Sequence, residues 1–579
     1  EAYRFAKGEQ VGLQPYRPDG TATRTARLRR PLDFTVLTDH AELLGEIRMC
    51  STPGSPGYDG DFCWVYQNFR PATFSFMAVR TMIQRDRFAF CGEDGELCLE
   101  QARLVWKDIQ AAAEEAYDRS AECTFSSFVG YEWTGSVGTG ENLHRNVVFR
   151  NDKVPERPPS WVDTASAFDL WTHLQAQCVD GVDGCEALTI PHNSNISGPG
   201  LMFASAKLEG PDDLSLSVDA KEARLRRRWE PLVEIMQHKG DSECLPGRDT
   251  KDEACGFEKL PYNSFAGVGS ISEQNIATRP GLPVPDLTPD PRAMVRGALK
   301  KGIQLEHEIG ENPLKYGIIA STDTHLGTPG LVAEDDPKGH GGAGTRRVIG
   351  LPDDLEFNPG GLAVLWAEEN SRDALFDAMQ RREAYGTSGT RPVVRFFGGW
   401  GLADEMCKGD DFAERGYAEG VPMGADLPKR GEQDRDPRFA VWALHDPGSD
   451  EAPGTPLDRI QIVKGWIEDG EQKEKVIDVK RSRGRASVDP MTCETKGEGA
   501  SQLCAVWRDR DFDPDQNAFY YARILESPTC RWSQHLCVEA GVSCDDPSTI
   551  EPGFEDCCRA DHQPVIQERA WTSPIWYSP

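Results

Sequence analysis

Residues 31–45 read PLDFTVLTDHAELLG, and this stretch holds the first information on both the fold and the site. The apolar run at residues 34–37 is typical of a buried strand, and it ends abruptly on Asp39 and His40. A turn that carries incidental charge explains this stretch, and so does a strand end that delivers ligands into a site. Recurrence of the pattern along the chain separates these two explanations.

The same pattern recurs in four later segments of the chain. They are SFVGYEWTG with Glu132, ENLHRNVVF with His144, ALTIPHNSN with His192, and YGIIASTDTHLG with Asp323 and His325. Each segment places a His, Asp or Glu at or beside the end of an apolar run. In a parallel β/α barrel the carboxyl ends of the strands converge on one mouth, so residues far apart in sequence meet there.

Imidazole and carboxylate groups together are the ligand set of Zn²⁺, Mn²⁺ or Fe²⁺ in proteins. A single His at a strand end is usually a hydrogen-bonded structural residue. Five segments with ligand-type residues in the same position are much harder to obtain by accident. The recurrence therefore predicts a metal site, in which a Glu between two ions can bridge them.

The pattern of apolar runs changes near residue 390. From residue 30 to 390, apolar strands alternate with amphipathic helical stretches, which favours parallel strands covered by helices. After residue 390 the runs are short, β-branched or aromatic, and separated by turn residues, as in RIQIVKGW. This pattern of short runs predicts an antiparallel β-sandwich. We expect two domains, residues 1–390 and residues 391–579.

The charge balance restricts the partners. The 579-residue chain has 64 Lys and Arg against 94 Asp and Glu, a net charge of −30. Such a surface repels nucleic acid and anionic membranes. A small anionic substrate remains compatible if a metal ion or a local Arg supplies positive charge. No window of about 18 apolar residues occurs, so we expect no transmembrane segment.

The 17 cysteines predict disulfide bonds. Many lie close together in Gly-, Pro- and Asp-rich segments, and no CxxC pair supports a zinc ribbon. The close pairs are Cys50/Cys63, Cys91/Cys98, Cys178/Cys185, Cys244/Cys255, Cys493/Cys504 and Cys530/Cys537. Disulfides between near neighbours indicate an oxidising compartment, periplasmic or secreted, with connectivity left open. The odd count leaves at least one thiol unpaired or bonded to another molecule.

The motifs DFTVLTDHAE, GYEWTG, LHRNVVFRN, IPHNSN and STDTH resemble those of the polymerase-and-histidinol-phosphatase (PHP) superfamily, in particular an uncharacterised exported branch. The resemblance extends through EIMQHKGDSE and YGTSGTRPVVRFF to the tail ERAWTSPIWYSP, so it covers nearly the whole chain. It implies an α/β fold, a distorted (β/α)₇ PHP-type barrel followed by a smaller antiparallel β-sandwich-like domain. It also implies hydrolysis of phosphoesters at a centre of two or three divalent ions, Zn, Mn or Fe.

The resemblance also implies a role for each ligand. Glu132 would bridge two ions, His144 and His192 would hold the second ion, and Asp323 the first. His40 and His325 would belong to a third ion, and Asp39 would orient a ligand. The family opens with a His-x-His motif on its first strand, whereas no His precedes His40 here. We expect a natural N-terminal stretch to be missing, so that the barrel lacks its first strand; the alternative is a crippled first metal site.

The leading functional prediction is a metal-dependent phosphoesterase that uses a metal-bridging hydroxide as nucleophile. Lys239 and Arg145 are candidates to bind the substrate anion, although a structural ion pair explains each of them equally well. An amide, lactone or sulfate-ester hydrolase on the same metal site is the first alternative. A non-catalytic binding or surface module is the second. The substrate, the metal and the oligomeric state stay open.

Overall fold

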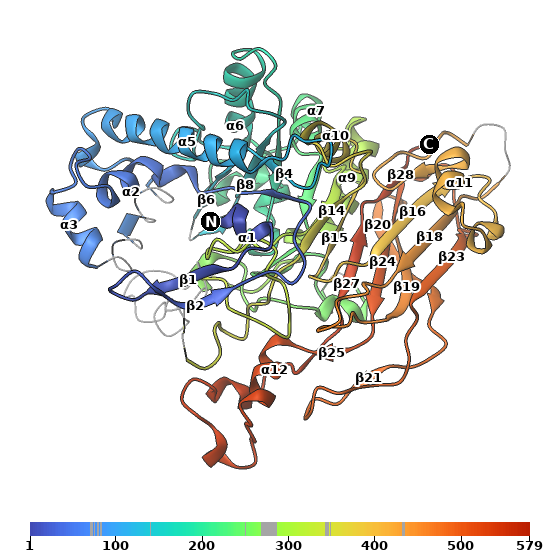
Figure 1. Cartoon of the computed structure of the whole chain (residues 1–579). Helices are drawn as coiled ribbons and strands as arrows, with labels where there is room; N and C mark the ends of the chain where they lie inside the picture. The colour runs from blue at the N-terminus through green and yellow to red at the C-terminus, as the bar shows by residue number, and fades with distance from the viewer. Residues whose placement is uncertain are drawn as a thin grey trace.

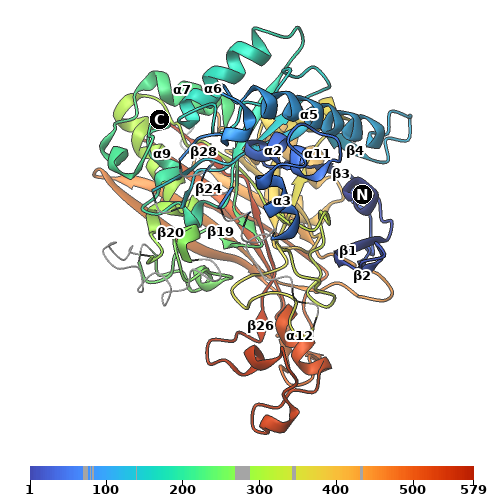
Figure 2. The ribbon, with the colours of Figure 1, turned by 90° about the vertical axis from the view of Figure 1, so that its left-hand side faces the viewer.

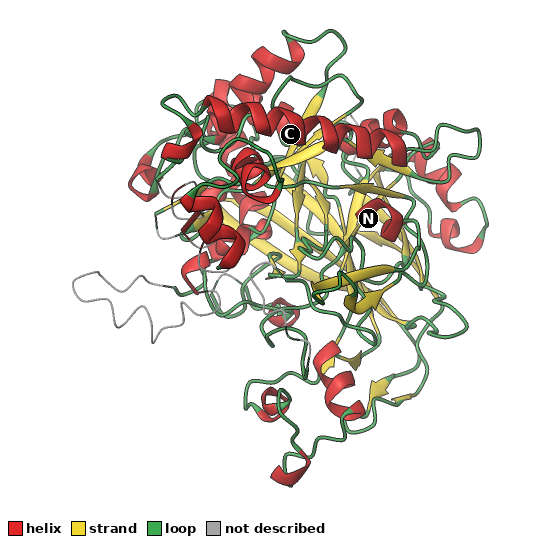
Figure 3. Ribbon diagram, turned by 60° about the vertical axis from the view of Figure 1, so that its left-hand side comes forward, coloured by secondary structure: helices red, strands yellow, loops and turns green. Residues whose placement is uncertain are grey.

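The computed structural model describes residues 1–69, 73, 76–77, 80, 84–138, 140–248, 250–267, 287–341, 347, 349–430 and 435–579. Most helices gather on one side of the molecule and the long strands on the other (Figures 1 and 3). The described helices are α1 (Ala2–Ala6), α2 (Leu44–Ser51), α3 (Asp61–Asn68), α5 (Glu96–Ala116), α6 (Ala167–Leu174), α7 (Ala220–Trp229), α9 (Val295–Ile309), α10 (Arg372–Gln380), α11 (Phe412–Glu419) and α12 (Trp532–Glu539). None of them is both long and apolar enough to cross a membrane.

Strands within residues 11–319 form six small sheets in the described part of the chain. β3 (Phe34–Val36) pairs in parallel with β4 (Ser126–Phe128), and β10 (Leu232–Glu234) pairs in parallel with β13 (Gly317–Ile319). β5 (Gly130–Trp133), β8 (Arg145–Phe149) and β9 (Ala187–Pro191) form an antiparallel sheet in that order. The remaining short strands are β1 (Val11–Tyr16), β2 (Ala22–Ala26), β6 (Ser136–Val137), β7 (Glu141–Asn142), β11 (Met236–Gln237), β12 (Gly240–Asp241), β21 (Ser487–Val488) and β22 (Thr495–Lys496).

The predicted (β/α)₇ barrel is wrong. The described strands form many separate sheets, and no closed barrel joins them. The physical reason lies in the connections: only a short segment separates β5 from β8, too short for the helical crossover that a parallel pair requires. The two strands therefore run antiparallel, with Glu132 opposite Asn146. Alternation of strands and helices along the sequence did not reveal this pairing.

A seven-stranded antiparallel sheet is the largest element of the fold. Its main path is β14 (Leu362–Leu365), β15 (Ala384–Thr387), β27 (Arg569–Thr572), β24 (Ala518–Glu526), β19 (Leu457–Glu468) and β20 (Glu471–Arg481), and β28 (Ile575–Tyr577) pairs with β24. The sheet takes strands from both sides of the predicted boundary at residues 390/391. The chain segments on the two sides are thus joined by hydrogen-bonded strands.

A second, four-stranded antiparallel sheet packs on the large sheet. It consists of β17 (Val421–Pro422), β16 (Val393–Gly399), β18 (Arg438–Leu444) and β23 (Gln502–Arg508). The ring of Phe439 on β18 stacks on Tyr520 of β24, with 4.1 Å between the centroids. Such aromatic stacking adds to the burial of apolar area between the sheets.

Strand β24 is buried on both faces. Tyr520 and Ala522 join the core with the four-stranded sheet, whereas Phe519 and Tyr521 join the core that contains helix α9. Successive side chains of a strand point to opposite faces, so the consecutive residues 518–522 supply apolar side chains to both cores. The large sheet is therefore the middle layer, between the four-stranded sheet and the half of the chain that carries β10 and β13, and Figure 1 shows β24 and β27 beside β16 and β18.

A small arm containing α12, β25 (Thr529–Cys530) and β26 (Val565–Ile566) extends away from the body (Figures 1 and 2). Disulfides fasten this arm: Cys493–Cys530, Cys537–Cys557 and Cys544–Cys558. The others are Cys50–Cys63, Cys91–Cys98, Cys178–Cys185, Cys244–Cys255 and Cys407–Cys504. The prediction of extensive disulfide bonding is confirmed, and Cys123 is left as the free cysteine.

Candidate metal centre

Glu132 lies at the middle of a cluster of imidazole and carboxylate groups. It sits on β5, where its backbone N–H donates to the carbonyl of Asp39 at 2.9 Å. A parallel bridge also joins His40 to Glu132. The segment that follows β3 is thereby fixed beside β5, and the carboxylate of Glu132 is only 4% exposed.

His144 and His192 reach the same carboxylate from neighbouring strands. His144 immediately precedes β8 and His192 immediately follows β9. Because β8 and β9 are antiparallel, with Arg145 opposite Pro191, the start of one strand lies beside the end of the other. His144 Nδ1 is 2.7 Å and His192 Nε2 is 3.3 Å from Oε1 of Glu132.

His40 contacts the other oxygen of the same carboxylate. Its Nδ1 lies 3.4 Å from Oε2 of Glu132 and 2.7 Å from the hydroxyl of Thr134. The His40 ring is also 5.7 Å from the ring of His325. His40 therefore links the Glu132 group to a second group around Asp323.

The second group contains Asp323 and His325, which follow β13, and His238, which lies between β11 and β12. Asp323 has a φ of 51°, in the left-handed region that non-glycine residues rarely adopt. Its Oδ2 accepts hydrogen bonds from Gln237 Nε2 at 2.5 Å and from the ammonium of Lys239. His238 Nε2 lies 2.9 Å from the same ammonium, and His325 Nδ1 lies 3.9 Å from Asp323 Oδ1.

The Glu132 carboxylate is held in its charged form. Burial alone raises its pKa, but His40, His192 and His144 outweigh that effect and hold the pKa of Glu132 well below its usual value. Burial lowers the pKa of His144 to about 4. Burial lowers the pKa of His192, but the carboxylates of Glu132, Glu234 and Asp323 together outweigh burial and raise the pKa to about 9. The group is thus a buried, charged carboxylate with three imidazoles beside it.

Burial and neighbouring charges also set the pKa values of the Asp323 group. Burial raises the pKa of Asp323, but Lys239 and His325 outweigh it, so that the pKa falls to about 2. Burial lowers the pKa of His325 to about 4. A charged carboxylate and a neutral imidazole are the protonation states that metal coordination requires.

Two further residues of the cluster escaped the sequence analysis. Glu234 ends β10 and accepts hydrogen bonds from Asn193 N at 3.0 Å and from the hydroxyl of Ser321. Burial raises the pKa of Glu234 to about 7. The available sequence signal for Glu234 was a carboxylate inside the apolar run LVEIM. His340 stacks on His238 with 5.0 Å between ring centroids, but it lies in a Gly-rich loop that no apolar run precedes.

The structure separates the predicted site residues into three classes. His40, Glu132, His144, His192, Asp323 and His325 come together, as described above. Asp39 joins them at the wall of a cavity. Lys239 reaches Asp323 but lies behind it, 4% exposed and away from that wall. Arg145 is not brought to the cluster: its Nε pairs with Glu230 at 3.0 Å in the protein interior.

The cavity beside the cluster has a volume of about 910 Å³. Asp39, His40, Glu132, His192, Asp323 and His325 contribute to its polar end. The rest of the wall is largely apolar and includes Val148, Ile190, Leu232, Ile319 and Met379. A cavity with a small convergent set of polar groups and apolar walls is the usual form of a small-molecule site.

The residues present fit divalent metal ions. The ligand atoms of Glu132, His144 and His192 lie within 4.8 Å of one another, and so do those of His238, Asp323 and His325. The buried Nδ1 atoms of His192 and His238 have no hydrogen-bond partner in the described part of the chain. Imidazole and carboxylate donors suit Zn²⁺, Mn²⁺ and Fe²⁺.

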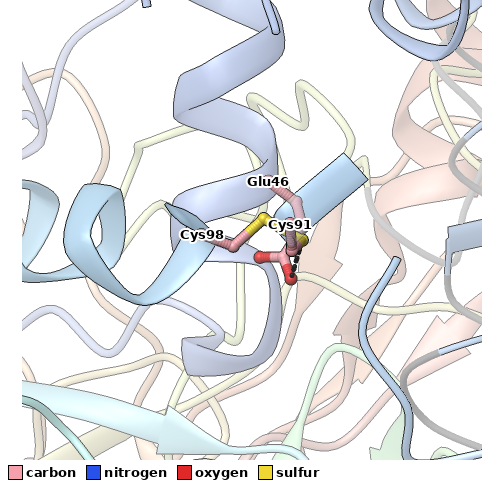
Figure 4. Close-up of side chains that lie close together, drawn as sticks. All are labelled: Glu46, Cys91 and Cys98. Carbon is pink, nitrogen blue, oxygen red and sulfur yellow. Dashed lines mark hydrogen bonds between the residues drawn. A yellow bond between two sulfur atoms is a disulfide. The ribbon is translucent and has the colours of Figure 1, made fainter. Parts of the chain in front are cut away.

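Two other groups that combine Cys with a carboxylate do not fit a metal. Figure 4 shows Glu46 beside Cys91 and Cys98, whose sulfur atoms are joined in a disulfide. The group of Asp252 with Cys244 and Cys255 is likewise a disulfide with a neighbouring carboxylate. Metal coordination needs thiolates, which a disulfide does not offer.

Comparison with known proteins gives one match. No curated protein and no solved structure matches the chain. The family model described as "Protein of unknown function (DUF3604)" matches residues 1–579, and the chain therefore belongs to the DUF3604 family.

Proposed function

We propose that this protein is a metal-dependent hydrolase, with a phosphoester as the first-choice substrate. The observation that carries the proposal is the convergence of His40, His144 and His192 on the buried carboxylate of Glu132, at the wall of a cavity. Divalent ions held there would supply Lewis acidity and lower the pKa of a water molecule toward neutrality.

The chain's own residues supply the framework for this chemistry. Glu132 offers its two oxygens to different sides of the cluster, toward His144 and toward His40. His325 and Asp323 form the adjoining part of the wall. Gln237 and Lys239 both donate hydrogen bonds to the Asp323 carboxylate, and we assign a positioning role to Gln237.

The cavity itself favours a second candidate, hydrolysis of an amide, lactone or sulfate ester. Arg145 is committed to Glu230, and Lys239 lies away from the cavity wall, so neither side chain lines the cavity to meet an anionic substrate. In a phosphoesterase the ions themselves must then neutralise the phosphoryl group. The apolar wall around Val148 and Ile190 suits a substrate with an uncharged apolar part.

Four further statements belong to the proposal. The eight disulfides support export, to the periplasm or the extracellular space. Two or three divalent ions, Zn, Mn or Fe, are the proposed cofactors. The PHP resemblance is retained for the ligand set alone, because the barrel that it implied is wrong. The net charge of −30 disfavours nucleic acid as a partner.

A substrate panel with metal-loaded and chelated protein tests the proposal. The panel contains small phosphomonoesters and phosphodiesters, aryl amides, lactones and aryl sulfates, each with Zn²⁺ or Mn²⁺. We expect phosphoester cleavage that chelation abolishes and added metal restores. Cleavage confined to the other substrates moves the assignment to the second candidate. Full metal occupancy without hydrolysis of any substrate instead identifies a binding module.

A further inference from the structure

The positively charged ammonium of Lys239 lies inside the metal-ligand cluster. Its ammonium lies 2.9 Å from Nε2 of His238 and hydrogen-bonds Oδ2 of Asp323. The backbone around it is fixed, because Asn195 Nδ2 donates to the carbonyl of Lys239 at 3.0 Å. The side chain is 5% exposed. The ammonium of Lys239 is therefore a buried part of the Asp323 group.

The atoms that Lys239 contacts are also metal-ligand atoms. His238, Asp323 and His325 offer ligand atoms within 4.8 Å of one another, two imidazoles and one carboxylate. The lone pair of His238 Nε2 accepts from the ammonium and is then not available to an ion. A divalent ion near these ligands would also lie close to a like charge in a poorly solvated place, where repulsion is strong.

The Glu132 group has no such competitor. Among the described residues, the ion-pair partners of Glu132 are the imidazoles of His40, His144 and His192. The two halves of the cluster thus differ in one respect: among the described residues, only the Asp323 half holds a lysine ammonium, which is not itself a metal ligand, whereas each imidazole beside Glu132 becomes a ligand once it is neutral.

We infer that Lys239 and a divalent ion compete for the cation site formed by His238, Asp323 and His325. The inference rests on the metal centre of the proposed function and goes beyond it, because it assigns His238 as a ligand and sets the order of loading. The Glu132 half takes the first ion tightly. The Asp323 half takes its ion weakly, because that ion must displace the ammonium of Lys239 from Asp323 and His238.

Metal-binding calorimetry with Zn²⁺ or Mn²⁺ tests the inference without any activity assay. Wild-type protein should bind one ion tightly and a second ion weakly. K239M removes the ammonium and leaves Asp323 without its cation, so the second ion should bind at least about tenfold more tightly. K239R retains the positive charge and should bind the second ion as weakly as wild type.

K464M is the matched control. Lys464 is another buried lysine, 2.6 Å from Asp509, on β19 in the large sheet. Its loss should leave both binding constants unchanged, and circular dichroism should show that each variant is folded. Unchanged or weaker binding of the second ion by folded K239M overturns the competition while the proposed centre stands. Tighter binding together with inactivity toward every substrate supports the competition and ends the proposed function. If the chain binds neither ion, both fail.

Discussion

Oε1 of Glu132 on β5 lies 2.7 Å from Nδ1 of His144, which immediately precedes the adjoining antiparallel strand β8. His192 approaches the same oxygen from the far side of β8. One carboxylate is therefore shared by imidazoles from two further strand ends. The negative charge of Glu132 is the feature on which the whole cluster depends.

Glu132→Gln should lower metal occupancy most among single substitutions of the cluster. The substitution keeps the side-chain volume but removes the charge that His144 and His192 face. Elemental analysis after dialysis against trace metal should find a loss of at least about tenfold in affinity, since removal of a direct ligand exceeds the 10–100-fold effect of outer residues.

Glu42→Gln is the control for this change. Glu42 is also a buried carboxylate, and it accepts hydrogen bonds from Thr134 N and Trp161 N without contacting the imidazoles. Its substitution should leave metal occupancy intact. Equal occupancy in wild type and folded Glu132→Gln contradicts the assignment of Glu132 as a ligand.

His325→Ala should reduce kcat more than it raises KM. His325 lies between His40 and Asp323 at the cavity wall, where it contacts other site residues. A group that stabilises the transition state more than the bound substrate produces this split. Steady-state kinetics on a substrate identified by the panel is the measurement. His307→Ala on the exposed side of α9 should change neither constant, and a rise in KM alone would assign His325 to substrate binding.

The strand-end pattern located the core of the site because it depends only on local sequence. A buried apolar run that stops on a His or carboxylate was sufficient to find His192 and Asp323. His340 could not be found this way, because a glycine-rich loop brings it to the cluster. Arg145 was indistinguishable from a site residue, since alternation along β8 turns its side chain to Glu230.

The fold was less predictable because strand pairing is not local. Strands such as β3 and β10 have three residues each and carry little information on their partners. Disulfide pairing shows the same limit. Close spacing correctly joins Cys50 to Cys63, whereas Cys493 lies near Cys504 in sequence but bonds Cys530. The partner of Cys504 is Cys407, which the folded sheets bring beside it.

Thiol titration of unfolded, unreduced protein should find about one free thiol per chain. The eight disulfides leave Cys123 as the free cysteine, and it is only partly buried. Cys123→Ser should reduce the titrated value to zero. Ten or more free thiols in freshly isolated protein would contradict an oxidising compartment.

Glu243→Gln should destabilise the protein by about 3–5 kcal/mol, because it leaves buried arginines without their counter-charge. Glu243 receives two contacts from Arg523 Nη1, at 2.9 and 3.0 Å, and pairs with Arg296. Burial raises its pKa, but these guanidinium groups hold the pKa well below its usual value. Denaturant unfolding at neutral pH measures the loss. A change in unfolding free energy below 1 kcal/mol would show that Glu243 does not stabilise the contact between α9 and β24.

Glu526→Gln should stabilise the protein at alkaline pH relative to acidic pH. Glu526 ends β24 with 0% exposure, and burial raises its pKa to about 8 from an ordinary value of 4.5. A carboxyl whose pKa is raised on folding contributes stability below pH 4.5, and that contribution is lost as pH rises toward 8. Gln remains neutral throughout. The difference in unfolding free energy between variant and wild type should therefore grow by at least about 1.4 kcal/mol from pH 5 to pH 8.5, the value of one pKa unit.

Glu468→Gln, at an exposed position of β19, is the control and should show the same difference in unfolding free energy at both pH values. A Glu526→Gln difference that does not change with pH would mean that Glu526 is ionised in the folded protein at pH 5.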